Sequence, residues 1–149
     1  MNKKVTFFKK RKIIKRENDT PYLIRWNLFE CPAFSIKIHK ILRSDYDCLH
    51  DHPRAFVSLI LWGGYVEHRD VVTCEHWSVD DSDERTERVS KIYHPGNILY
   101  RRAEDRHKLE IHQPAWTLVI TFKKKRQWGF WTKAGWVPFF KYNSDASCE

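Results

Sequence analysis

Runs of apolar side chains with a period of two, rather than helical repeats, dominate the sequence after its first sixteen residues. Residues 34–40 alternate apolar and polar side chains, which predicts a half-buried strand with His39 on its polar face. Residues 56–62 are almost all apolar and end at a Gly-Gly pair, which predicts a strand buried on both faces. Residues 116–122 alternate again and are rich in β-branched and aromatic side chains, as is typical of strands.

Shorter strand candidates lie between Gly and Pro turn signals. They are residues 71–79, 88–93, 98–100, 128–131 and 136–142. The acidic segment 80–87 is expected to be a solvated hairpin tip, because its carboxylates lack the Gly-centred spacing of a calcium loop. Many short strands separated by turn residues predict an all-β sandwich or barrel.

The composition fits one folded domain. The chain has 149 residues, is 42% hydrophobic and contains seven Trp, which excludes a disordered chain. Its longest apolar run, residues 55–65, is interrupted and shorter than the ~20 residues that a membrane helix needs. Residues 1–16 lack the apolar stretch of a secretory leader. We therefore expect a cytoplasmic protein that does not enter a membrane.

The net charge of +8 is concentrated at the N-terminus. Residues 1–16 hold eight Lys and Arg and no acid, so subtracting 8 from +8 leaves residues 17–149 with no net charge. This division predicts a basic N-terminal arm, residues 1–16, and a folded domain, residues 17–149. The arm could bind nucleic-acid phosphates, or it could be a solvated tail that keeps a neutral domain in solution.

The four cysteines have no recognisable pattern. Cys31, Cys48, Cys74 and Cys148 form no CxxC pair and have no regular spacing. This argues against a disulfide framework and against a zinc finger. We expect free thiols, as in a reducing compartment.

Two histidines stand close together just before the long apolar run. His50 and His52 lie two residues apart, and in an extended segment such side chains point to the same side. Neutral imidazoles are ligands that zinc, iron and nickel accept. Because two ligands rarely hold a metal, a third is expected from elsewhere in the fold.

The spacing around this pair resembles the two sequence motifs of the cupin superfamily. The first motif, G-x5-H-x-H-x3,4-E-x6-G, is matched by both histidines and Gly63, and the second, G-x5-P-x-G-x2-H-x3-N, by Gly96 and His107. Residues 116–142 also look like the end of bacterial and phage cupin-like proteins. The resemblance implies a small single-domain cupin with a jelly-roll β-barrel, and the pairing of two copies into a homodimer.

Several motif positions differ from the cupin pattern. They are Ser44, Phe56 or Val57, Arg102, Glu104 and Ile111. Because the motif glutamate is missing, a three-histidine site of His50, His52 and His107 remains, which resembles that of thiol and diketone-cleaving dioxygenases. The resemblance implies a divalent metal, with Fe(II) favoured and Zn(II), Ni(II) or Mn(II) as alternatives. Glu67, Glu104 or Glu110 could add a carboxylate, and the spacing favours none of them.

The ligand set implied by the resemblance predicts a non-haem iron oxygenase that acts on a small anionic molecule. Guanidinium and phenol groups near the histidines are the candidate substrate contacts, since arginine forks onto carboxylates and phosphates. These candidates are Arg54, Arg101, Arg102, Arg106, Tyr65 and Tyr100. Two alternatives stay open: a non-catalytic cupin-like module that binds a small molecule, and a nucleic-acid-associated protein that uses residues 1–16. No P-loop, G-x-S-x-G or dinucleotide motif is present.

Overall fold

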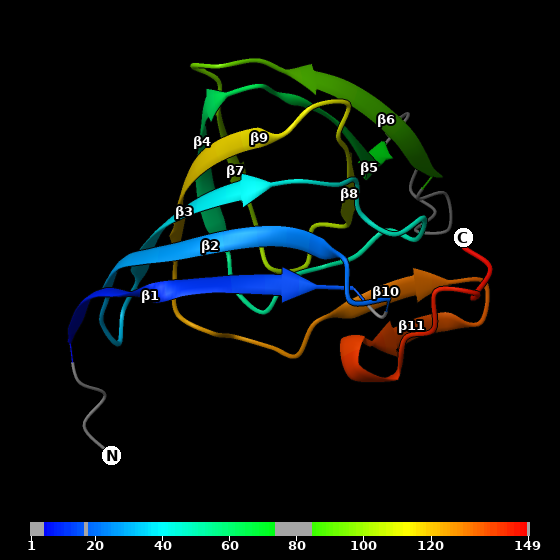
Figure 1. Cartoon of the computed structure of the whole chain (residues 1–149). Coiled ribbons are helices and arrows are strands. Elements are labelled where there is room, and N and C mark those ends of the chain that lie inside the picture. Colours follow the sequence, from blue (N-terminus) through cyan, green and yellow to red (C-terminus); the bar gives the residue numbers. More distant parts are fainter. Residues whose placement is uncertain (1–4, 17, 74–84, 149) are drawn as a thin grey trace, which may run out of the picture.

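The computed structural model of the chain (Figure 1) describes residues 5–16, 18–73 and 85–148. Eleven β-strands and one short 3-10 helix form its regular structure within these residues. The elements are β1 (Thr6–Lys15), β2 (Pro21–Glu30), β3 (Ser35–Ile41), β4 (Phe56–Trp62), β5 (Tyr65–Thr73), β6 (Arg85–Tyr93), β7 (Ile98–Arg101), β8 (His107–Glu110), β9 (Ala115–Thr121), β10 (Gly129–Thr132), β11 (Gly135–Pro138) and η1 (Phe139–Lys141). No helix in the described ranges is long and apolar enough to cross a membrane.

The strands form three antiparallel sheets. A six-stranded sheet has the order β1-β2-β3-β9-β4-β7, a three-stranded sheet has the order β6-β5-β8, and β10 pairs with β11. Side chains of the two larger sheets line one pocket, and the β10-β11 hairpin lies at one end of the molecule (Figure 1). The sheets do not close into a continuous hydrogen-bonded barrel. The expected all-β, jelly-roll architecture is confirmed.

Most of the basic N-terminal segment belongs to the large sheet. Residues 6–15, which the charge count assigned to a separate arm, form β1 and pair with β2. Lys9 binds Glu30 at 2.6 Å, and Ile14 packs against the core. The charge boundary at residue 16 therefore lies directly after β1, which is the edge strand of the six-stranded sheet.

Side chains of β3 point alternately to the inner and the outer face of the six-stranded sheet. Lys37 and His39 line the pocket, and Ile36 and Ile38 alternate with them on the outer side. The half-buried strand is confirmed. However, its polar face is the inner one, and a period of two alone cannot tell which face meets solvent.

The apolar run 56–62 forms β4, and the expectation that both of its faces are buried is wrong. Ser58 and Ile60 are buried on the inner side, whereas Leu61 is 43% and Trp62 is 69% exposed. In the described part of the chain no layer covers the outer face of this strand. A continuous apolar run thus marks an uncovered sheet face here, not a central strand.

Gly63 makes the turn into β5 possible. Its φ of +77° is unfavourable for other residues, and a Cβ there would lie 2.6 Å from the carbonyl oxygen of Pro114. This close approach gives the motif glycine a steric reason.

The structure contains a disulfide between Cys48 and Cys148. The expectation of free thiols is wrong for this pair, which is separated by 100 residues, a distance at which spacing carries no signal. Cys31 is free, and Cys74 lies outside the described residues. The bond ties the C-terminal segment to the loop that carries His50.

The shorter predicted strands are found with shifted ends. Candidates 88–93 and 98–100 lie in β6 and β7, and 128–131 overlaps β10. Of the candidate 71–79, the part up to Thr73 lies in β5, while residues 74–84, including most of the acidic segment, lie outside the described residues.

Candidate metal centre and its pocket

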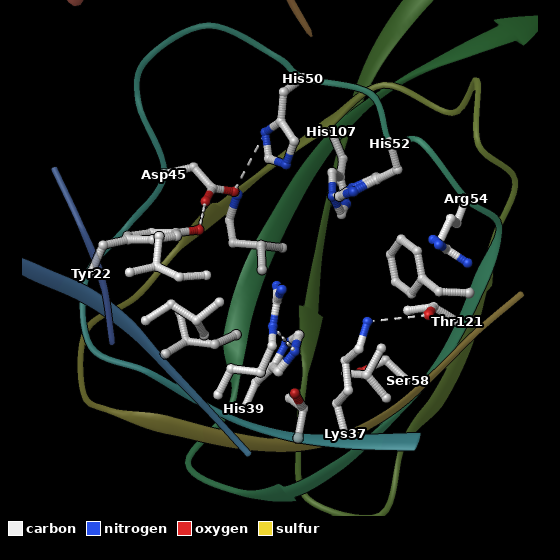
Figure 2. Close-up of a pocket in the computed structure, with 18 of the residues that line it drawn as sticks. Tyr22, Lys37, His39, Asp45, His50, His52, Arg54, Ser58, His107 and Thr121 are labelled. Atoms are coloured by element: carbon white, nitrogen blue, oxygen red, sulfur yellow. Dashed lines mark hydrogen bonds and ion pairs between the residues drawn. The ribbon is translucent and has the colours of Figure 1, made fainter. Parts of the chain in front are cut away.

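The three predicted histidines meet at one wall of the pocket. His50 and His52 lie in the loop between β3 and β4, and His107 begins β8. The backbones of His50 and His107 pair with each other, with N···O distances of 2.9 and 3.0 Å. This isolated bridge brings the two motifs together. One ring nitrogen of each residue then lies within 4.8 Å of the others. Figure 2 shows the three side chains together at one side of the pocket.

The environment keeps at least two of these imidazoles neutral. Burial lowers the pKa of His50 to about 4, although Asp45 opposes the shift. Burial, followed by repulsion from His107 and His50, also lowers the pKa of His52. A neutral imidazole has a free lone pair for a metal, whereas an imidazolium has none. The pocket therefore keeps His50 and His52 in the neutral form that can bind a metal.

Glu67 fixes the orientation of His107. Its fully buried carboxylate accepts a hydrogen bond from His107 Nδ1 at 2.6 Å and forms an ion pair with Arg101. Burial raises the pKa of Glu67, but the hydrogen bonds from His107 and Arg101 outweigh this effect and lower it to about 2. With Nδ1 engaged, His107 presents Nε2 to the cluster. A carboxylate behind a ligating histidine is the usual support of a metal site.

A second carboxylate lies behind His50. Asp45 accepts hydrogen bonds from the Tyr22 hydroxyl and from the backbone N–H of Leu109, and one of its oxygens lies 3.8 Å from His50 Nδ1. His50 Nδ1 is buried and has no hydrogen-bond partner. The other ring nitrogen of His50 turns toward the remaining two histidines in Figure 2. Asp45 therefore lies behind His50 without the hydrogen bond by which Glu67 orients His107.

The residues present fit a divalent metal. His52 Nε2 and His107 Nε2 face each other at 2.7 Å, and two neutral imidazoles can share that contact only if one of them donates a proton. Two nitrogens bonded to one ion at ~2.1 Å and at right angles would be ~3 Å apart. For His52 and His107, a cation in place of the shared proton would therefore require only a small movement of the two rings, and the His50 nitrogen lies within 4.8 Å of both.

The histidine cluster opens into a cavity of about 420 Å³, within the size range of small-molecule sites. β2, β3, β4 and β9 form one side of it, and β5 and β8 form the other. Trp128 and Phe130 of the C-terminal segment lie next to His50, with ring centroids 6.1 and 5.8 Å from its ring. The aromatic side chains of this C-terminal segment therefore pack beside the histidine cluster.

Among the predicted substrate contacts, Arg54 and Tyr65 line the pocket and the other four residues do not. Arg101 is buried in its ion pair with Glu67, so its position is structural support for the cluster. Tyr100 is 55% exposed on the outer side of the large sheet.

The two remaining arginines are bound elsewhere. Arg102 is exposed and binds Asp105 at 3.1 Å, and Arg106 lies over the ring of Trp131 at 3.3 Å. Their closeness to His107 along the chain therefore does not bring their side chains into the cavity.

The sequence interpretation missed a second group of polar residues in the cavity. Arg25, Lys37 and His39 reach into it from β2 and β3, together with hydroxyl groups from β4 and β9. The alternation of residues 34–40 predicts a polar face of the strand, but it does not show whether that face points into the domain or to solvent. Glu67, which the sequence suggests as a possible metal ligand, instead binds His107 from behind.

Comparison with known proteins places the fold. No family profile and no curated protein sequence matches the chain. A cupin-2 domain protein from Rhodospirillum rubrum is similar, with a TM-score of 0.58 at 14% identity over 85% of this chain and 77% of that one. HEPD from Streptomyces albus, solved with 2-hydroxyethylphosphonate and Fe(II), gives 0.54 at 14% identity over 78% of this chain and 25% of that one.

A third structure is hydroxypropylphosphonic acid epoxidase from S. wedmorenis. Its TM-score is 0.51 at 13% identity, over 76% of this chain and 56% of that one, so the chain spans about half the length of the epoxidase. At these identities the likeness concerns the fold, which the two motifs also indicate. The chain therefore has the jelly-roll fold of the cupin superfamily.

Proposed function

We propose that this chain is a metal-dependent cupin enzyme, a non-haem iron oxygenase that acts on a small anionic molecule. The observation that carries the proposal is the convergence of three largely buried histidines on the wall of a 420 Å³ cavity. Support also comes from a fold neighbour, since the HEPD structure holds Fe(II).

Three histidines of the chain would bind the ion, and a carboxylate behind them would fix the orientation of a ligating ring. His50, His52 and His107 would ligate through one nitrogen each. Bound Fe(II) would supply the redox chemistry that no side chain of the cluster offers. Glu67 would keep the ring of His107 oriented, and Asp45 lies 3.8 Å from Nδ1 of His50.

Three neutral ligands leave the full charge of a divalent ion in the cavity. An anionic substrate would neutralise that charge, which is why we assign the protein a small anion. Arg54 and Tyr65, the two predicted contacts that line the cavity, would help to position it. Trp128 and Phe130 would limit the access of water to the cluster.

The test is anaerobic loading of the untagged chain with Fe(II), followed by two measurements. Nitric oxide should give the spectrum of a high-spin iron–nitrosyl complex, which requires an open coordination position. Dioxygen uptake should then depend on an added anion from a panel of phosphonates, hydroxy acids and thiols.

The matched control is His112→Ala, because His112 has a 72% exposed side chain outside the cluster. We expect this variant to behave as the wild type and His107→Ala to lose both signals. Iron binding without dioxygen uptake would contradict the oxygenase. Binding of an anion by a chain that takes up no metal would favour the non-catalytic binding module.

A further inference from the structure

The cavity has a second polar wall that the histidine cluster does not explain. Lys37 and His39 extend from β3 on the side opposite the three histidines (Figure 2), and Arg25 of β2 also lines the cavity. We propose that this wall binds the dianionic head group of the ligand, a tetrahedral oxyanion of the phosphate or phosphonate type. The proposal deepens the proposed function by naming a substrate class, yet the anion site does not need the metal.

Strand register brings the donors together. Arg25 pairs with His39, and Lys37 lies two residues away on the same face of β3. Diagonal neighbours of this kind have Cβ atoms about 7–8 Å apart, so two long cationic side chains can reach one ligand. On the neighbouring strands, Thr121 of β9 lies near Lys37, with Lys37 Nζ donating to its Oγ1 at 3.3 Å, and Ser58 of β4 also lines the cavity.

His39 acts as a positioning residue for Arg25. Arg25 Nε donates to His39 Nε2 at 3.0 Å, which requires a neutral imidazole at that nitrogen. Burial, followed by repulsion from Arg25 and Lys37, lowers the pKa of His39 and keeps it neutral. The guanidinium is therefore held by one nitrogen, and its terminal N–H groups stay available to a ligand.

The positive charge of this wall is not compensated within the described residues. Neither Arg25 nor Lys37 forms an ion pair there; Glu30, which acts on Lys37 electrostatically, pairs with Lys9. Half-buried cations without a counter-ion lower the stability of the chain. Burial, followed by repulsion from Arg25 and Arg54, lowers the pKa of Lys37 to about 8. An anion in the cavity would compensate these charges and so remove their electrostatic cost to stability.

The charge of the cavity side chains, counted without a metal, favours a dianion. The cavity is lined by three cations, Arg25, Lys37 and Arg54, and by one carboxylate, Asp45, so its side chains sum to 3 − 1 = +2. Asp45 already accepts two hydrogen bonds at the histidine end. At the other end, donors come from β2, β3, β4 and β9, which surround a tetrahedral group better than a planar carboxylate.

The experiment measures the binding of inorganic phosphate, sulfate and acetate to the full chain by titration calorimetry at pH 7, with and without a chelator. We expect phosphate and sulfate to bind at least about 10-fold more tightly than acetate, because a dianion uses both cations. Lys37→Met and Arg25→Met should each weaken phosphate binding by at least about 10-fold, the loss of one charge-assisted contact.

Lys40→Met is the matched control. Lys40 is on the same strand but lies against the ring of Trp116, outside the cavity, and its replacement should leave phosphate binding unchanged. Lys37→Arg should restore most of the affinity, which separates a role in binding from a folding defect. Equal affinities for phosphate and acetate, or unchanged binding in Lys37→Met, would overturn the proposal.

The outcomes also separate this site from the metal site. His52→Ala should keep phosphate binding in the presence of chelator, and Lys37→Met should keep the metal content. Phosphate binding that disappears with the chelator would overturn the proposal, because the anion would then be bound by the metal alone.

Discussion

The two faces of the six-stranded sheet differ in the residues they carry, although core residues such as Leu23, Ile41 and Ile60 also lie on the inner side. The inner face carries the polar residues Lys37, His39, Thr117 and Thr121, which line a cavity. The outer face carries two rows of apolar residues across four strands. By register these rows are Ile36–Ile120–Val57–Tyr100 and Ile38–Leu118–Leu59–Ile98.

The difference shows that the two faces serve different purposes. Polar residues inside a domain lower its stability unless they are satisfied, so a polar inner wall is typical of a ligand site rather than a core. Apolar residues outside are equally unusual when they form one patch, and Ile98 and Tyr100 are 69% and 55% exposed. The homodimer predicted from the cupin resemblance would cover this patch with a second copy.

The largest effect is expected from Glu67→Gln on the inner side. The substitution leaves the buried Arg101 without its charge partner and gives His107 Nδ1 a neutral amide oxygen in place of a carboxylate. Loss of one partner of a buried pair should lower the free energy of unfolding by about 3–5 kcal/mol. Urea denaturation measures it. Glu110→Gln is the control, because the half-exposed Glu110 binds His68 and His112, and its substitution should lower the free energy of unfolding far less.

A smaller effect, of opposite sign, is expected from Lys37→Met. The folded chain releases the Lys37 proton near pH 8, whereas an unfolded lysine keeps it to about pH 10.4. The unfolded state therefore holds more protons between these values, so the wild-type free energy of unfolding should rise with pH there. At pH 7 the variant should be more stable by about 1–2 kcal/mol, after allowance for partial solvent exposure.

This prediction is checked by urea denaturation from pH 7 to 10.5 without added anions. The Lys37 contribution to the rise should be absent in Lys37→Met and retained in Lys40→Met. A variant less stable than the wild type at pH 7 would show that Lys37 is already compensated by a charge in the folded chain, and the polar inner wall would lose its interpretation as a ligand site.

The smallest effect on folding, and the sharpest on assembly, is expected from Ile98→Lys on the outer face. A substitution at a side chain that is 69% exposed should change the stability of one chain by less than about 0.5 kcal/mol. Sedimentation velocity should nevertheless shift from dimer to monomer, because a lysine would be buried against the second copy. Phe140→Lys, at another exposed apolar residue, is the control. A wild-type chain that sediments as a monomer would refute the predicted dimer.

The same comparison explains what could be predicted from the sequence. The strands and the three histidines follow from local periodicity and fixed motif spacing. The inner position of Lys37 and His39 could not follow, because alternation has no direction until the facing sheet is known. Arg101 was expected to contact substrate, but its role depends on Glu67, a partner 34 residues away. The Cys48–Cys148 bond is likewise set by the fold alone.

The most direct measurement is the metal content of the untagged chain, purified from medium rich in iron and zinc. Elemental analysis should find about one divalent ion per chain in the wild type and in His112→Ala. The variant with His50, His52 and His107 all replaced by Ala should hold essentially none while keeping the wild-type circular dichroism spectrum. A wild-type chain without bound metal, or equal metal content in the triple variant, would contradict the account.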